Sequence, residues 1–193
     1  MTARALRPHF RRVALIGIGL INGSLALVMR RTKLADEIVA CARSETTLAK
    51  ARQLGLADRT TSVPREAVEG ADLVVIGTPV GAVAEVAEAM APGLAPGTIV
   101  TDVGSIKAEV IRAVVPRLPE PALFVGGHPV AGTEHSGPEA AFDTLFENRH
   151  CILTPIEDTD PEAVRTVAGL WQVAGSTIET MTPEHHDRVL AIT

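Results

Sequence analysis

The feature that most constrains the fold of this chain is a short segment near its start, residues 13–24, which reads Val-Ala-Leu-Ile-Gly-Ile-Gly-Leu-Ile-Asn-Gly-Ser. Its apolar beginning is typical of a buried strand, and the helical spacing of the leucines that follow is typical of a helix. Gly17 permits a tight turn between the two, and Gly19 lets a ligand approach the backbone. Because a helix N-terminus at such a turn attracts an anion, the segment predicts a site for the pyrophosphate of a dinucleotide.

The glycine pattern of this segment is incomplete. A dinucleotide fingerprint would place its third glycine at position 22, where the chain has Asn22, and Gly23 follows one residue later. We expect the first helical turn (Leu20, Ile21 and Asn22) to complete the cofactor site. A plain strand, turn and helix of a parallel sheet is the alternative interpretation of the segment taken alone.

Composition limits the class of protein. The chain has 193 residues, of which 46% are hydrophobic and 21% charged, so it can form one globular domain with a substantial core. Its formal net charge of -5 leaves no basic stripe for nucleic acid. No apolar run approaches the roughly 20 residues that span a bilayer. We therefore expect neither a nucleic-acid partner nor a membrane partner.

The two cysteines indicate a reducing environment. Cys41 and Cys151 each lie within an apolar, strand-like run. Two buried free thiols, without a disulfide framework, are the simplest interpretation of this placement. We therefore expect the protein in the cytoplasm.

Strand-like and helix-like segments alternate through most of the chain. After the first strand, strands are expected at residues 37–42, 58–61, 72–77, 98–102 and 123–125, and helices at residues 22–31, 46–54, 64–69, 80–90 and 106–115, the last with Ser105 as its N-cap. The strands are apolar on both faces. This pattern predicts a Rossmann-type, doubly wound α/β fold with a mostly parallel sheet and helices on both faces.

The ends of the chain complete the expected organisation. Residues 1–12 read as a basic leader, with Arg4, Arg7, Arg11 and Arg12 in solvent, and residues 13–180 as a dinucleotide-binding domain. Within that domain, residues 149–154 and 177–179 are expected strands around a helix at 161–173. Residues 181–193 open a helix, with Thr182 as N-cap and Pro183 at its first position, which we expect to connect to further sequence.

Candidate cofactor contacts follow the second and fourth strands, because ligands of such sheets bind at the carboxyl ends of the strands. The second strand ends at Ala42, which cannot bind a ribose hydroxyl, and Arg43 and Ser44 follow. Since an arginine there can pair with a 2′-phosphate, the sequence leans toward NADP+ over NAD+. The alternative is that Arg43 stacks on the adenine or is only exposed to solvent. Thr78-Pro79 is either a cofactor contact or a strand-ending turn.

Candidate catalytic residues follow the fifth and sixth strands. Gly126-Gly127-His128-Pro129 holds a single histidine in a rigid frame, and an imidazole can accept a proton from a hydroxyl that is being oxidised. Ser105 can donate to a substrate oxygen. Lys107 is either a contact for a substrate carboxylate or a surface lysine. The loop at residues 132–137 could close over a nicotinamide. We assign no role to the remaining histidines and expect no metal site, since they lack ligand spacing (His9, His135, His150, His185 and His186).

Together these segments resemble the prephenate/arogenate dehydrogenase family of tyrosine biosynthesis. The matching residues lie at 17–24, 78–79, 101–107, 126–134, 153–155 and 181–187, and Gly-Gly-His-Pro-Val-Ala-Gly-Thr-Glu is the most specific of them. The resemblance implies an NAD(P)+-dependent oxidative decarboxylation of prephenate or arogenate. His128 would take the ring hydroxyl proton and Ser105 would orient the hydroxyl beside the nicotinamide, with Lys107 and Thr133 as lesser substrate contacts.

The resemblance also implies a helical domain after residue 193 that completes the substrate site and joins two subunits into a homodimer. Two alternatives stay open at this point. One is a non-catalytic or truncated NAD(P)-binding module. The other is a different Rossmann oxidoreductase of the 3-hydroxyacid dehydrogenase type, although such enzymes place a catalytic lysine on a helix of a downstream domain.

Overall fold

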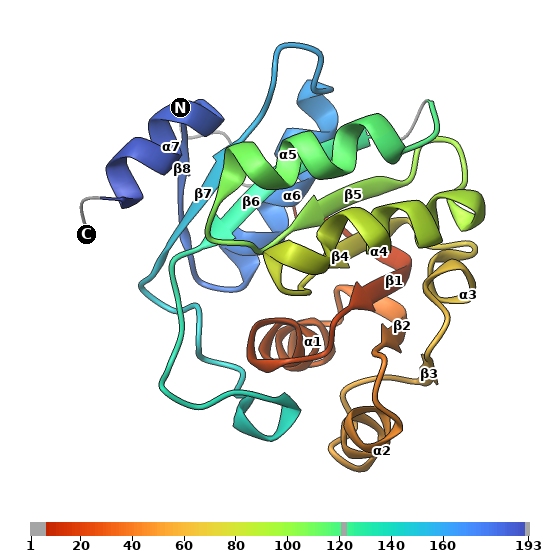
Figure 1. Ribbon diagram of the computed structural model, residues 1–193. Coiled ribbons are helices and arrows are strands. Elements are labelled where there is room, and N and C mark those ends of the chain that lie inside the picture. The colour runs from red at the N-terminus through yellow and green to blue at the C-terminus, as the bar shows by residue number, and fades with distance from the viewer. Residues whose placement is uncertain (1–6, 121–122, 192–193) are drawn as a thin grey trace.

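A computed structural model describes residues 7–120 and 123–191, and in them an eight-stranded sheet has the order β3-β2-β1-β4-β5-β6-β7-β8 (Figure 1). The strands are β1 (Phe10–Ile16), β2 (Ala35–Cys41), β3 (Arg59–Thr61), β4 (Leu73–Ile76), β5 (Ile99–Asp102), β6 (Leu123–Pro129), β7 (His150–Thr154) and β8 (Thr177–Thr180). The helices are α1 (Leu20–Thr32), α2 (Glu45–Gln53), α3 (Pro64–Val68), α4 (Val83–Met90), α5 (Lys107–Val114), α6 (Pro161–Val173) and α7 (Pro183–Leu190). The expected Rossmann-type α/β fold is confirmed.

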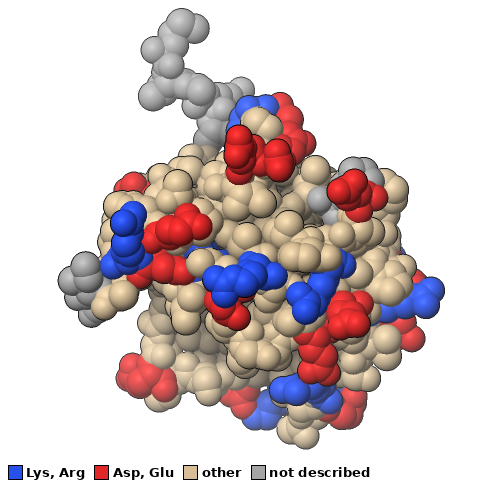
Figure 2. All heavy atoms as spheres, turned by 45° about the horizontal axis from the view of Figure 1, so that its top comes forward, with Lys and Arg blue, Asp and Glu red and all other residues tan. Residues whose placement is uncertain are grey.

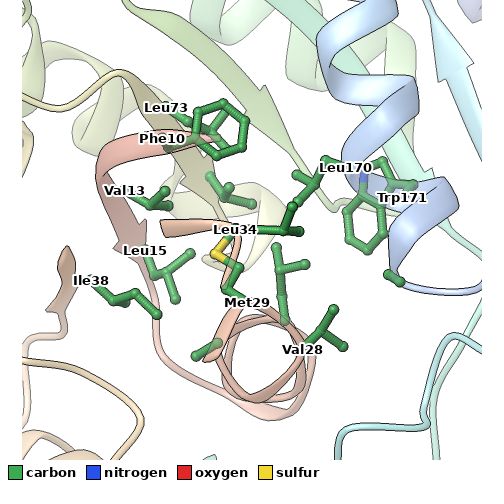
Figure 3. Close-up of a cluster of buried hydrophobic side chains, with 14 of the residues drawn as sticks. Phe10, Val13, Leu15, Val28, Met29, Leu34, Ile38, Leu73, Leu170 and Trp171 are labelled. Carbon is green, nitrogen blue, oxygen red and sulfur yellow. The ribbon is translucent and has the colours of Figure 1, made fainter. Parts of the chain in front are cut away.

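The sheet is buried on both faces because its strands carry apolar side chains at successive positions. In β1, Val13 and Leu15 join one core cluster, and Ala14 and Ile16 join the other. Helices α1 and α6 pack on the first face, while α3, α4 and α5 pack on the second (Figure 1). Figure 3 shows the first cluster, which joins side chains of β1, α1 and α6, including Trp171.

Strand β6 differs from the expected strand at residues 123–125. It continues through the Gly-Gly-His-Pro segment to Pro129, pairing parallel with β5 in its first half and antiparallel with β7 in its second. A Cβ on Gly126 would clash with the Thr154 hydroxyl, and one on Gly127 would lie 2.8 Å from the carbonyl oxygen of Asp102. The two glycines therefore serve close strand packing, where the sequence suggested a rigid turn.

The first strand begins earlier than expected. Because β1 starts at Phe10, Arg11 and Arg12 belong to the sheet and are not part of a solvated leader. Arg11 pairs with Asp72 at 2.8 Å, and Arg12 pairs with Glu37 at 2.6 Å. Arg4 lies outside the described residues. The expected boundary of the leader at residue 12 is corrected accordingly.

The last helix begins as the sequence predicts. Pro183 is the first residue of α7, and the Thr182 side chain accepts a hydrogen bond from the His185 backbone N–H at 3.3 Å. The helix ends at Leu190, and residues 192–193 of the expected connecting helix lie outside the described residues. In the described part of the chain, no helix is long and apolar enough to cross a membrane.

Candidate active site

A cavity of about 470 Å³ lies at the carboxyl ends of β1, β2 and β4. Five of the residues predicted to bind a cofactor line it: Gly17, Gly19, Arg43, Thr78 and Pro79. Because these strands run parallel, their ends meet at one edge of the sheet, as the sequence predicted. The cavity therefore lies where ligands of this fold class bind.

The two glycines of the turn after β1 have different surroundings. Gly17 has a φ of 89°, and a Cβ on it would lie 2.8 Å from the carbonyl carbon of Gly77. At Gly19, the N-cap of α1, an added Cβ would meet no protein atom within 4 Å. Gly17 thus makes the turn, while Gly19 leaves open space in front of the helix N-terminus.

Asn22 and Gly23 explain the incomplete glycine fingerprint. The Asn22 side chain is buried and points back into the sheet, where its amide donates to the carbonyl oxygens of Gly17 at 3.0 Å and Val75 at 3.2 Å. A Cβ on Gly23 would lie 2.9 Å from Cβ of Ala141, so the close packing that needs glycine occurs one position later.

The side chains of four other predicted cofactor residues do not line the cavity. Leu20 and Ile21 pack against the core, and Asn22 bonds the strand carbonyls. The Ser44 hydroxyl caps α2 by accepting from the Thr47 N–H at 3.4 Å. The backbone N–H groups of Leu20, Ile21 and Asn22, in the first turn of α1, are the polar groups that these residues can offer to a cofactor.

Two of the predicted cofactor residues at the cavity have polar side chains that are free to meet a ligand. Arg43 is exposed and forms no ion pair within the described residues. The Thr78 hydroxyl is buried and has no hydrogen-bond partner in the same part of the chain. An unpaired buried hydroxyl costs free energy, so its presence at the cavity fits a site that a polar ligand completes.

His128 lies on the second half of β6, further along the same edge of the sheet. Its Nδ1 atom is 2.8 Å from Nε2 of His186, and Nδ1 of His186 is 2.8 Å from Oδ1 of Asp187. His186 is fully buried, with an exposed fraction of 0%. The sequence interpretation gave neither His186 nor Asp187 a role, although His-His-Asp within the first two turns of the helix capped by Thr182 was a visible signal.

The environment of His128 keeps its imidazole neutral. Burial, together with the neighbouring His186 and Lys107, lowers the pKa of His128 from 6.5 to about 4, and Asp187 only partly opposes this shift. A neutral imidazole carries a lone pair at one ring nitrogen. His128 can therefore accept a proton at neutral pH.

Lys107 is neither a surface lysine nor an open substrate contact. Its side chain is buried, and its ammonium group donates to the Asp102 carboxylate and, at 2.6 Å, to the Gly127 carbonyl oxygen. Burial raises the pKa of Asp102 and lowers that of Lys107, and the attraction between the two side chains opposes both shifts. The pair holds the peptide that precedes His128.

Ser105 is not the N-cap of α5. That position is Ile106, which gives no side-chain hydrogen bond. The Asp187 carboxylate caps α5 instead, accepting from the backbone N–H groups of Lys107 at 2.7 Å and Ala108 at 2.9 Å. Because a residue from α7 takes this role, the exposed Ser105 hydroxyl is not engaged in capping.

The long loop between β6 and β7 returns to the cavity. It runs toward α1 and α2 (Figure 1), and its residues Gly137 and Pro138 line the cavity. Glu139 pairs there with Lys50 of α2. Thr133 is exposed in this loop, and its hydroxyl bonds the backbone of His135.

The surface shows no basic stripe on the face in view. Figure 2 shows Lys and Arg side chains interspersed with Asp and Glu, so that neither sign of charge forms a continuous patch there. Among the described residues, opposite charges also pair locally, for example Arg112 with Glu109 at 2.7 Å.

The fold and the cavity define a nucleotide-binding domain of the Rossmann type. Residues 25–180 match the family described as "Prephenate dehydrogenase, nucleotide-binding domain". The chain belongs to this family.

Relatives and solved structures agree with this assignment. The chain is 42% identical to cyclohexadienyl dehydrogenase of Zymomonas mobilis over 95% of its own length and 62% of that protein. It is 36% identical to prephenate dehydrogenase of Bacillus subtilis, covering 93% of this chain and 49% of that protein. The chain therefore spans about half to two thirds of the length of these relatives.

Two solved structures share the fold closely. Prephenate dehydrogenase of Aquifex aeolicus, in complex with hydroxyphenyl propionate and NAD+, superposes with a TM-score of 0.83 at 32% identity, over 96% of this chain and 64% of that one. Arogenate dehydrogenase of Synechocystis superposes with a TM-score of 0.85 at 32% identity, over 93% and 63%.

Proposed function

We propose that the protein catalyses the NAD(P)+-dependent oxidative decarboxylation of prephenate, arogenate or both, in tyrosine biosynthesis. The observation that carries this proposal is His128, a neutral imidazole at the same sheet edge as the nucleotide cavity. Its Nε2 atom has no hydrogen-bond partner within residues 7–120 and 123–191. The names of the Z. mobilis and B. subtilis relatives support the choice of substrate class.

The residues at the cavity fit a dinucleotide. Gly17, Gly19 and the first turn of α1 would hold its pyrophosphate, and Thr78 would supply a hydroxyl contact. The free guanidinium of Arg43 favours a 2′-phosphate, so the proposal includes a preference for NADP+. When bound, the nicotinamide accepts a hydride from the substrate.

The chain supplies orientation and proton handling. The Nε2 atom of His128 accepts the proton of the ring hydroxyl, while the hydrogen on the carbon that bears this hydroxyl leaves as a hydride. The bond to the ring carboxylate then breaks, carbon dioxide departs, and the ring becomes aromatic. Ser105 orients the hydroxyl, and Thr133 is a lesser substrate contact. Lys107 acts through the Gly127 peptide.

The proposal includes a homodimer, which the family resemblance implies, and a cytoplasmic location, which the two buried free thiols favour. The subunits of the homodimer would meet through a helical domain outside the matched region. Light scattering of a purified native form that includes this helical domain measures the mass directly, and a monomer at working concentration would contradict this part of the proposal.

Formation of NAD(P)H from prephenate and from arogenate tests the activity. The assay includes the 193-residue chain and any longer native form, because the chain spans 62% of the Z. mobilis relative. His128→Asn should lower kcat on the order of 10²–10⁴-fold with little change in cofactor affinity. The exposed His150→Asn is the matched control. A His128→Asn enzyme within a few-fold of wild type would refute the proposed role.

A further inference from the structure

We infer that His186 and Asp187 are positioning residues for His128, which hold its imidazole in the tautomer that leaves Nε2 as the proton acceptor. The inference rests on the proposed function, in which His128 takes a proton. It assigns a role to two residues of α7 that lie 58 positions or more from His128 in the sequence.

The chain of hydrogen bonds starts at an ionised carboxylate. Asp187 accepts from three donors: the backbone N–H groups of Lys107 and Ala108, and Nδ1 of His186. Burial raises the pKa of Asp187, but these donors outweigh it and lower the pKa below its ordinary value. Asp187 is therefore an acceptor only, and the shared proton with His186 lies on the imidazole.

This proton fixes the tautomers of both histidines. With Nδ1 protonated, a neutral His186 has its lone pair on Nε2. That lone pair lies 2.8 Å from Nδ1 of His128, so His128 must carry its own proton on Nδ1. The lone pair of His128 is then on Nε2, which is the nitrogen without a partner in the described residues.

The same contacts join His128 to the Ser105 segment. Asp187 binds the first turn of α5, which begins two residues after Ser105, and α7 packs directly against α5 beside β7 (Figure 1). Because His186 is fully buried, its ring has little freedom to turn. The pair thus sets both the tautomer of His128 and its place relative to Ser105.

The tautomer can be measured without turnover. Nitrogen NMR of the histidine rings in the purified protein, at a pH where His128 is neutral, should show the Nδ1–H form for His128 and for His186. A predominant Nε2–H form of His128 would overturn the inference. This measurement stands even if the protein turned over neither substrate, so the inference and the proposed function fail separately.

Three variants test the consequence for catalysis. His186→Leu removes the acceptor for His128 Nδ1–H, and we expect mixed tautomers and a kcat lower by on the order of 10–10²-fold, with an unchanged KM for the cofactor. His186→Gln keeps an acceptor oxygen and should restore the Nδ1–H form and most of kcat. His185→Leu, an exposed neighbour on the same helix, is the matched control and should behave as wild type.

Two results would contradict the inference. One is a His186→Leu enzyme with a kcat within two- to three-fold of wild type while His128→Asn is inactive. The other is a folded His186→Gln enzyme that restores the thermal unfolding midpoint but neither kcat nor the tautomer. If His186→Leu does not fold, the NMR result for the wild type and the His186→Gln kinetics decide the question.

Discussion

Asp102 and Lys107 form a buried ion pair that binds both the N–H and the carbonyl oxygen of Gly127. Asp102 accepts the Gly127 N–H at 3.1 Å, and Lys107 donates to the Gly127 carbonyl oxygen at 2.6 Å. The exposed fractions of the two side chains are 2% and 0%. The backbone that carries His128 is thus fixed by charges that water does not reach.

Removing one member of this pair should be strongly destabilising. Lys107→Met would leave the Asp102 carboxylate buried without its counter-ion, and we expect a loss of about 3–5 kcal/mol in the free energy of unfolding. Urea denaturation measures the loss. Lys50→Met, which breaks the exposed pair with Glu139, is the matched control and should leave the urea midpoint close to that of wild type. Equal effects of the two changes would contradict the prediction.

The turn at Gly17 should not tolerate a side chain. Gly17→Ala combines a φ of 89° with a Cβ 2.8 Å from the Gly77 carbonyl carbon. We expect a loss of roughly 1–3 kcal/mol in stability together with weaker cofactor binding. Thermal unfolding and fluorescence titration with NADPH check both effects. Gly81→Ala, where a Cβ would meet nothing within 4 Å, should change neither.

Arg43 should govern the choice between the two cofactors. A charge-assisted hydrogen bond to a 2′-phosphate contributes roughly 1.5–3 kcal/mol, so Arg43→Ala should raise the KM for NADP+ about 10–100-fold. The KM for NAD+ should stay within about two-fold, since NAD+ lacks that phosphate. Steady-state kinetics with both cofactors provides the test. A parallel rise in both KM values would show that Arg43 does not read the 2′-phosphate.

The low pKa of His128 in the folded protein should make the protein less stable in mild acid. Its pKa is about 4 in the folded protein, because of burial and of His186 and Lys107, against 6.5 for an ordinary histidine. Between these values the unfolded chain binds more protons than the folded one, so stability falls as the pH is lowered from about 6.5 to about 4. Denaturation across this window should show a slope that His128→Gln reduces. Identical slopes in both proteins would contradict the shifted pKa.

Much of the fold could be predicted because its signals are local. The apolar runs of β1 and β4 identify strands buried on both faces, and Gly17 marks the turn that only a positive φ permits. The N-cap at Thr182 was equally readable, since a side chain three residues from its partner decides it. The cavity lined by Gly19 and Arg43 follows from the parallel strand order.

Other features depended on partners distant in sequence. Serine is a residue type common at N-caps, so Ser105 was predicted to cap α5. The group that caps this helix is instead the carboxylate of Asp187, on α7. The sequence allowed Lys107 to be a surface residue, because nothing near it in the chain shows that its ammonium group binds the Gly127 carbonyl oxygen of β6. The glycines at 126–127 were interpreted as a rigid frame for His128, because nothing in the segment shows that Thr154 of β7 lies close to Gly126.

The sequence by itself determined the mostly parallel sheet and the glycine turn before α1, because periodicity and backbone stereochemistry act over a few residues. Only the tertiary structure decided the partners of His128. The hydrogen bond between His128 and His186 depends on the docking of α7 on α5, and the buried charge pair beside Gly127 depends on the pairing of β6 with β5. Such contacts are selected by packing across the whole sheet, and no local pattern specifies them.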